Sequence, residues 1–204
     1  MLTKEQIRIL GAFKQEPFIK LTFKQIKGGV GQKSNNLVQK SLSEFGKEGL
    51  ITTEKVGNVI LYGLNLENNL TFSYLNLIND LDIEAKKSLK EILQNLQDRL
   101  MKHTQFFILL VFGSYAKNKQ GKGSDLDIAI IVESGETKKE ITPLIETIKR
   151  RELTKIDYHV ITKDEFLEMV KADYENLGKQ IYKNNMVFYG FVNYLNLIKE
   201  IKHE

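Results

Sequence analysis

Two apolar runs separated by a short polar segment constrain the fold of this chain most strongly. Residues 105–112 and 125–132 are rich in Ile, Leu, Val and Phe, a composition typical of buried strands. The first run stops at Gly113-Ser114, and the second opens with Asp125 and Asp127. Alternate residues of a strand face the same way, so the two aspartates project together, with Cα atoms roughly 6.5–7 Å apart at ~3.3 Å rise per residue. The sequence therefore predicts one strand that ends in a glycine turn and another that opens with paired carboxylates.

This pattern suits phosphate and metal chemistry. Gly113 lets the backbone approach a phosphate without a Cβ clash, and the Ser114 hydroxyl and nearby N–H groups can donate to its oxygens. Asp125 and Asp127 would repel each other without a cation, and Mg²⁺ suits an all-oxygen site that includes substrate phosphates. We do not expect zinc, because the chain has no cysteine and its three histidines show no ligand spacing.

The residues Phe112-Gly113-Ser114-Tyr115-Ala116-Lys117, followed by Gly123-Ser124-Asp125-Leu126-Asp127, resemble the signature of the DNA polymerase beta-like nucleotidyltransferase superfamily. The minimal nucleotidyltransferase branch is the most similar, and the resemblance covers about residues 82–190. It implies a third catalytic carboxylate on a later strand, for which Asp157 in Lys155–Ile161 is the matching candidate. The nucleotide-binding residues implied by the resemblance are Gly113, Ser114, Lys117 and Ser124. The family usually carries Arg and Gly after the alanine of the turn, whereas this chain has Lys117 and Asn118, so the charge is kept but the planar guanidinium fork is lost.

The reaction implied by the resemblance is transfer of a nucleoside monophosphate, AMP being the expected one, from ATP or another NTP to an acceptor hydroxyl. Asp125, Asp127 and Asp157 would be both the catalytic residues and the ligands of two Mg²⁺ ions about 3.5–4 Å apart, and Asp157 could also act as general base. Small transferases of this kind resemble kanamycin nucleotidyltransferase and also antitoxins that adenylylate a partner HEPN ribonuclease toxin. The acceptor is therefore expected to be a small molecule or a partner protein. The alternative is a DNA-binding transcriptional regulator whose transferase lobe only senses nucleotide. The departure from the family pattern at Lys117 and Asn118 is compatible with this alternative.

The first 66 residues are basic, whereas the rest of the chain is almost neutral. They hold ten Lys or Arg against five Asp or Glu, a net charge of +5, and the remainder holds twenty against twenty-one, a net charge of −1. Such a segment indicates a polyanion partner. We expect helices over residues 3–14, over 22–27 and from the N-cap Ser34 onward, and then a hairpin over 50–66. Three helices and a hairpin resemble a winged helix-turn-helix.

In a winged helix-turn-helix, the helix that begins at Ser34 would enter the DNA major groove. Outward Asn and Gln side chains could read base edges, Lys side chains could contact phosphates, and the hairpin tip would reach the flanking backbone. The candidate DNA-binding residues are Lys33, Asn35, Asn36, Gln39, Lys40 and Lys55. The alternative is a module used only for protein–protein contact or dimerisation, and a homo-oligomer is compatible with the sequence.

The predicted fold class is α+β. Residues 1–66 form the winged helix-turn-helix domain, residues 67–81 a linker, and residues 82–204 a nucleotidyltransferase-fold domain with a mixed sheet flanked by helices. Apolar spacing predicts helices over residues 82–103, 137–151 and 164–179. No run reaches the ~18 apolar residues that a membrane helix needs, and the N-terminus lacks a signal peptide's apolar segment. We therefore expect a cytoplasmic protein with no membrane partner.

Overall fold

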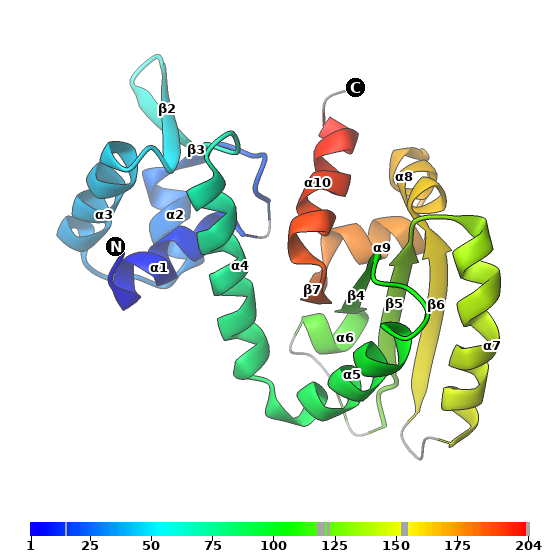
Figure 1. The fold of residues 1–204 in the computed structure, drawn as a ribbon. Coiled ribbons are helices and arrows are strands. Elements are labelled where there is room, and N and C mark those ends of the chain that lie inside the picture. Colours follow the sequence, from blue (N-terminus) through cyan, green and yellow to red (C-terminus); the bar gives the residue numbers. More distant parts are fainter. Residues whose placement is uncertain (15, 118–120, 122, 152–154, 203–204) are drawn as a thin grey trace. The chain divides into compact units, whose positions relative to one another are not determined.

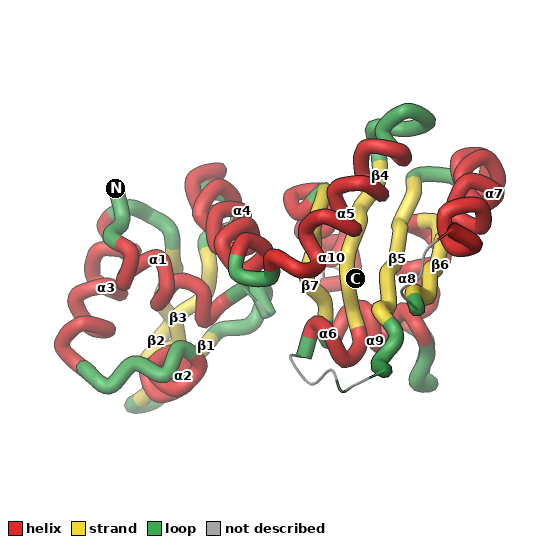
Figure 2. The backbone as a smooth tube through the Cα atoms, turned by 90° about the horizontal axis from the view of Figure 1, so that it is seen from below, coloured by secondary structure: helices red, strands yellow, loops and turns green. Residues whose placement is uncertain are grey.

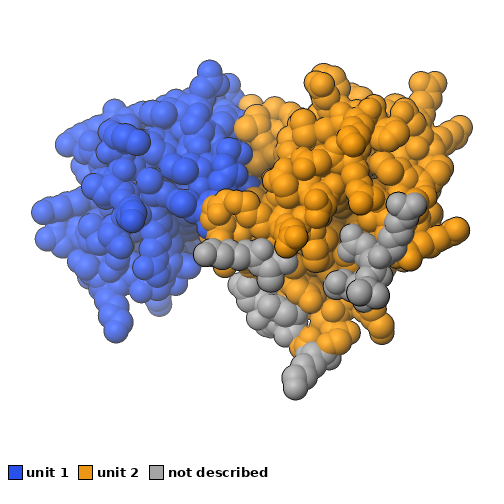
Figure 3. Space-filling model, turned by 60° about the horizontal axis from the view of Figure 1, so that its bottom comes forward, with its two compact units in different colours: residues 1–81 blue, residues 82–204 orange. Residues whose placement is uncertain are grey.

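The computed structural model describes residues 1–14, 16–117, 121, 123–151 and 155–202. The chain divides into two compact units, Met1–Leu81 and Asp82–Glu204, named unit 1 and unit 2 here (Figure 3). None of the described helices is both long and apolar enough to cross a membrane.

Unit 1 combines short helices with an antiparallel sheet (Figure 1). Its elements in chain order are α1 (Lys4–Leu10), the 3-10 helix η1 (Gly11–Phe13), β1 (Leu21–Thr22), α2 (Phe23–Gly29), α3 (Asn35–Lys47), β2 (Ile51–Val56) and β3 (Val59–Leu64). The strands pair in the order β1-β3-β2, and the β2–β3 hairpin turns at Gly57, whose φ is +59°. Unit 1 is thus a winged helix-turn-helix. Strand β1 is an addition to the predicted elements, because a two-residue strand has no alternation that a sequence pattern could reveal.

Helix α3 begins where the sequence predicted. The Ser34 hydroxyl accepts a hydrogen bond from the Leu37 N–H at 3.2 Å, which satisfies one of the amides left open at a helix start. Val38, Leu42 and Phe45 recur at helical spacing and are buried. Ser41 is buried with them, whereas Gln39, Lys40 and Ser43 are exposed. Burial of the apolar stripe therefore determines which polar residues can meet a partner.

Residues 67–81, predicted as a linker, lie in unit 1, and most of them belong to helix α4 (Asn69–Glu84). Thr71 and Leu75 are fully buried, and the Tyr74 hydroxyl accepts a hydrogen bond from the Leu2 N–H at 3.1 Å. Just before the helix, the Asn68 side chain donates to the Glu48 and Gly49 carbonyls at 3.2 and 3.1 Å. These contacts therefore fix the start of α4 to the end of α3 within unit 1.

Unit 2 is a mixed sheet with helices on both faces (Figure 2). Its elements are α5 (Lys87–Leu100), β4 (Phe107–Phe112), α6 (Gly113–Ala116), β5 (Leu126–Val132), α7 (Gly135–Arg151), β6 (Ile156–Thr162), α8 (Lys163–Lys171), α9 (Leu177–Lys183), β7 (Asn185–Tyr189) and α10 (Phe191–Lys202). The strand order is β6-β5-β4-β7. Only the β5–β6 pair is parallel among the described pairings, and α7, where a helix was predicted over residues 137–151, makes the crossover between these two strands.

The apolar residues of the central strands separate onto the two faces of the sheet. One face packs against α5 and α7 in a single buried cluster that includes Leu93, Val111, Ile128 and Ile145, and α8, α9 and α10 lie on the other face (Figure 2).

Two of the helices predicted from the sequence are each divided into two helices in the structure. The helix predicted over residues 82–103 is broken between Glu84 and Lys87, and the helix predicted over 164–179 is broken before α9, whose N-cap Asn176 accepts a hydrogen bond from the Lys179 N–H at 3.0 Å.

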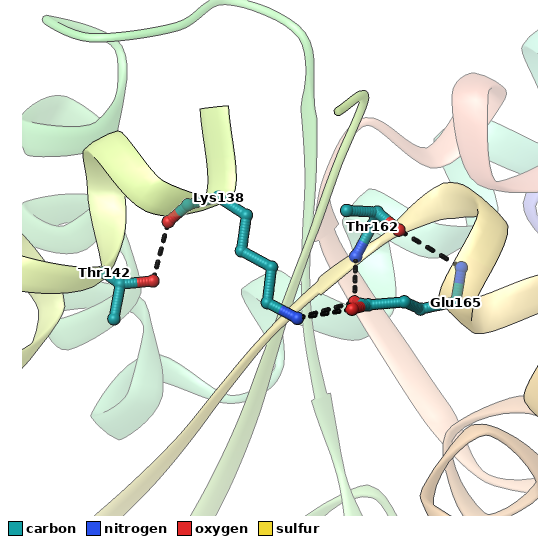
Figure 4. Close-up of polar contacts among 4 residues, drawn as sticks. All are labelled: Lys138, Thr142, Thr162 and Glu165. Carbon is teal, nitrogen blue, oxygen red and sulfur yellow. Dashed lines mark hydrogen bonds and ion pairs between the residues drawn. The ribbon is translucent and has the colours of Figure 1, made fainter. Parts of the chain in front are cut away.

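The carboxyl end of β6 is fixed by a polar cluster of Lys138, Thr142, Thr162 and Glu165 (Figure 4). Thr162 caps α8, because its hydroxyl accepts from the Glu165 N–H at 3.1 Å and its own N–H donates to the Glu165 carboxylate at 2.8 Å. The Lys138 ammonium binds both oxygens of that carboxylate at 2.6 and 2.7 Å, which lowers the Glu165 pKa. The cluster therefore joins the start of α7 to the end of β6 and the start of α8.

Candidate functional site

The predicted acids meet at the amino ends of β5 and β6. In the parallel register Asp127 lies directly opposite Asp157, so their side chains share one face of the sheet on strands about 4.8 Å apart. Asp125 lies two residues before Asp127, just ahead of β5, and is exposed. The structure thus brings together Asp127 and Asp157, thirty residues apart in the sequence, through strand pairing alone.

The Gly113 turn lies against the same carboxylate. Gly113 follows β4 and opens α6 with a φ of +67°, a conformation that favours glycine. A Cβ atom built on Gly113 would lie 2.1 Å from the Asp127 Oδ2 atom and 3.1 Å from its Cγ atom. Only a residue without a side chain leaves the Asp127 carboxylate in this position, so the glycine turn and the aspartate form one site.

Crowding of like charges perturbs Asp127. Partial burial raises the pKa of the Asp127 carboxyl, and repulsion from Asp157 and Asp125 raises it further, while His159 opposes the shift. Ionisation of Asp127 is therefore less favourable in the folded protein than in an unperturbed carboxyl, and a bound cation would offset this effect.

Two side chains that the sequence did not assign to the site engage Asp157. The Lys149 ammonium lies 3.5 Å from Asp157 Oδ1, and the His159 Nε2 atom lies 3.2 Å from Asp157 Oδ2. The His159 ring also packs against Phe112, with centroids 5.5 Å apart. Ala129 lies opposite His159 in the register, and this small side chain leaves room for the ring to reach across β5.

A sequence signal existed for one of these two residues. His159 follows Asp157 by two positions and must share its strand face, yet a surface histidine is the more ordinary interpretation of that pattern. Lys149 comes from the last turns of α7, and its contact with Asp157 arises only when the crossover helix returns to the edge of the sheet.

The remaining predicted nucleotide-binding residues take different positions. Ser114 is half-buried within α6, and Lys117 is exposed at the end of that helix, where its N–H donates to the Gly113 carbonyl at 3.3 Å. The Ser124 hydroxyl accepts from the Gly121 N–H at 2.9 Å, so it closes a local turn ahead of Asp125. Asn118 lies outside the described residues.

The donor set fits a hard divalent cation. In the described part of the chain, no group of three or more His, Asp or Glu side chains could hold a metal ion as the side chains lie. Mg²⁺, however, is usually bound by one or two carboxylates together with substrate phosphates. Asp127 and Asp157 supply two carboxylates in register, and the Gly113 turn lies beside them, where phosphates could bind. These residues therefore fit the protein's share of a magnesium site, in which the substrate phosphates supply the remaining ligands.

All six predicted DNA-contacting residues of unit 1 are exposed. Lys33 precedes α3, Lys55 lies on the hairpin, and Asn35, Asn36, Gln39 and Lys40 lie on α3. Lys27 of α2 donates to the Asn35 Oδ1 atom at 2.6 Å, which joins the two helices of the helix-turn-helix. Exposed apolar residues near the hairpin turn, Val56, Val59 and Ile60, were not part of the predicted surface.

Comparison with known proteins agrees with the geometry of unit 2. A family model described as "Polymerase beta, Nucleotidyltransferase" matches residues 94–190, the range that carries the turn and all three acids. No curated protein sequence matches the chain. Two solved structures are similar in part at 17% identity. MepR, a transcription regulator of the Staphylococcus aureus multidrug efflux pump MepA, has a TM-score of 0.35, covering 50% of this chain and 81% of its own. The PcaV transcriptional regulator from Streptomyces coelicolor has a TM-score of 0.33, covering 48% and 75%. The family match, the glycine turn and the paired strands agree: residues 94–190, within unit 2, form a nucleotidyltransferase domain that matches the polymerase beta family.

Proposed function

We propose that this protein is a Mg²⁺-dependent nucleotidyltransferase that transfers AMP from ATP to an acceptor hydroxyl and that binds DNA through unit 1. The observation that carries the proposal is the position of Gly113 against Asp127 with Asp157 opposite in the register. A phosphate-accepting turn in contact with paired carboxylates suits a substrate that presents phosphates and a cation together.

Each residue of the site would have a distinct role. Asp125, Asp127 and Asp157 would hold the metal, with the triphosphate supplying further oxygens. Magnesium, when bound, would neutralise phosphate charge and so stabilise the transition state of phosphoryl transfer. The Gly113 backbone and the Ser114 hydroxyl would donate to phosphate oxygens.

The reaction would replace one oxygen–phosphorus bond by another. The acceptor oxygen would form a bond to the α-phosphorus while the bond from that phosphorus to the bridging oxygen breaks, and pyrophosphate would leave with the bonding electrons. Asp157 would take the proton of the acceptor hydroxyl at a carboxylate oxygen. His159, 3.2 Å from that carboxylate, would orient it.

The acceptor we favour is a partner protein, such as a HEPN ribonuclease toxin. The support is the presence of a winged helix-turn-helix on the same chain, since a DNA-binding antitoxin can repress its own operon while it modifies its partner. This step is an argument from fold analogy, and a small-molecule acceptor is its competitor.

A second candidate function is a DNA-binding regulator that binds nucleotide without transferring it. The observation that favours it is the engagement of Asp157 by Lys149 and His159. A carboxylate with an ammonium and an imidazole this close to its two oxygens is less available as a base or a metal ligand.

The test is incubation of the full chain with α-labelled ATP, Mg²⁺ and native cell lysate. The variant Asp125→Asn/Asp127→Asn should abolish any transfer, whereas Asp173→Asn, which removes an exposed carboxylate in the loop after α8, should leave it intact. Label on a protein band supports a protein acceptor, and label on a small molecule supports the competing acceptor. ATP binding without transfer supports the regulator, and the absence of both binding and transfer would refute the proposal.

A further inference from the structure

The break between α4 and α5 places Lys86 beside α6 (Gly113–Ala116), which we call the nucleotide turn. Lys86 is the N-cap of α5 and has a non-helical backbone, with φ −110° and ψ 57°. Its N–H donates to the Ile83 carbonyl at 2.8 Å, and its own carbonyl accepts from the Leu89 N–H at 3.0 Å. Hydrogen bonds on both sides therefore fix the position of the Lys86 backbone.

The Lys86 side chain reaches an element 29 positions away in the chain. Its ammonium donates to the Tyr115 carbonyl oxygen at 2.9 Å in a partly buried contact. Tyr115 lies in α6 (Gly113–Ala116), the turn that we propose accepts the triphosphate. The last carbonyls of any helix lack partners within that helix, so a donor from outside can decide where a helix this short ends and how it is oriented.

Other contacts hold the same turn at different points. Gly113 lies against the Asp127 carboxylate, and the Tyr115 ring packs on the buried cluster beneath α5. The N-cap position, Phe112, provides no side-chain hydrogen bond to α6. The contact from Lys86 is charge-assisted and therefore stronger than a neutral hydrogen bond. It acts at the end of the turn opposite to Gly113.

We propose that Lys86 is a positioning residue of the nucleotide turn: its hydrogen bond to the Tyr115 carbonyl holds α6 in the orientation that binds the triphosphate. This inference rests on the proposed nucleotide-binding function. It assigns no contact between Lys86 and the substrate. It predicts that loss of Lys86 weakens nucleotide binding through the turn while the acids stay in place.

The experiment measures ATP affinity of the full chain by titration calorimetry with Mg²⁺. Lys86→Met should weaken ATP binding about tenfold, the effect of losing a charge-assisted hydrogen bond that orders the site. Lys86→Arg should restore most of the affinity, because a guanidinium can donate to the same carbonyl. Lys90→Met is the matched control, since Lys90 lies one turn further along α5 and pairs with Glu84; its affinity should equal that of the unaltered chain.

A second measurement, which needs no nucleotide, follows hydrogen exchange of the Lys117 amide, which donates to the Gly113 carbonyl. Lys86→Met should speed this exchange, and Lys86→Arg and Lys90→Met should not. Equal ATP affinity of Lys86→Met and the unaltered chain, or equal loss in Lys90→Met, would overturn the inference. If the unaltered chain binds no ATP, the proposed function fails, and unchanged exchange in Lys86→Met would then overturn the positioning role as well.

Discussion

Replacement of Gly113 by alanine tests whether the turn and the aspartate form one unit. The added methyl would sit 2.1 Å from the Asp127 Oδ2 atom, and the backbone φ of +67° is unfavourable for alanine. The backbone alone costs about 1–2 kcal/mol, and forcing the carboxylate out of its rotamer costs roughly 0.5–1.5 kcal/mol more. Gly113→Ala should therefore lower the free energy of unfolding of unit 2 by about 1.5–3.5 kcal/mol and abolish ATP binding.

The assay is a double-mutant cycle read by native-state hydrogen exchange of the β5 amides. In an Asp127→Ala background the methyl meets no carboxylate, so Gly113→Ala should cost only the backbone term of about 1–2 kcal/mol. Gly123→Ala is the control, because Gly123 has a φ of +90° but no atom within 4 Å of the added Cβ, and its cost should not depend on Asp127. Additivity of Gly113→Ala and Asp127→Ala to within about 0.5 kcal/mol would refute the reasoning.

Three further results are expected. Asp127→Asn should raise the free energy of unfolding by about 1 kcal/mol at pH 7 after solvent screening while abolishing ATP binding. The raised pKa of Asp127 means that its ionised form destabilises the folded state, so in urea titrations the gain should vanish as the pH falls below 3.8, the unperturbed value. Glu165→Gln should cost at most about 1 kcal/mol above pH 4.5, the unperturbed value, and the difference should disappear as the pH falls through the lowered folded pKa; an equal cost at pH 2 would contradict the ion-pair explanation. Lys33→Glu/Lys40→Glu should weaken binding of upstream DNA in a gel shift and reduce the salt slope by about 0.9 for each phosphate that is no longer neutralised, whereas Lys4→Glu on α1 should not; a salt-independent shift would count against DNA binding by α3.

The central strands of unit 2 were predictable because each one is marked by a run of apolar residues in its own sequence. Residues 107–112 and 128–132 are continuous apolar runs, a pattern typical of strands that are buried on both faces. The helix predicted between the two acid-bearing strands, β5 and β6, is long enough for a crossover, and the structure pairs the strands in parallel. The family resemblance implied a third acid on a later strand, and Asp157 could be matched to it because the position of an acid at the start of a strand survives small errors in the strand boundaries.

The contacts of Lys86, Lys149 and His159 could not be predicted in the same way. Lys86 meets Tyr115 only because α4 and α5 break where apolar spacing alone suggested one continuous helix. Lys149 meets Asp157 only at the edge of the finished sheet. Long polar side chains reach partners that are distant in sequence, and such contacts depend on tertiary packing and leave no periodic signal.

The packing of residues 67–81, predicted as a linker, depends on tertiary contacts in the same way. Thr71, Tyr74, Leu75 and Ile78 are buried, but the asparagines around them suggested a linker. The buried face depends on where α1 and η1 lie, since Ile78 packs near Gly11. Local composition could not reveal that surface.

The polar cluster at the end of β6 fixes the register of this strand against β5. The residues of β6 that face the buried cluster, Ile156, Tyr158 and Val160, are all apolar, so a slip of two residues along β5 would keep an apolar face inward. It would also put Lys155 or His159 in place of Asp157 opposite Asp127. Hydrophobic packing alone would not distinguish these registers. The Thr162 cap and its link to α7 therefore fix the register of β6 from its carboxyl end. Inserting two residues inside β6, between Asp157 and Thr162, should move Asp157 away from its position opposite Asp127 and yield a domain that folds normally and has lost its chemistry.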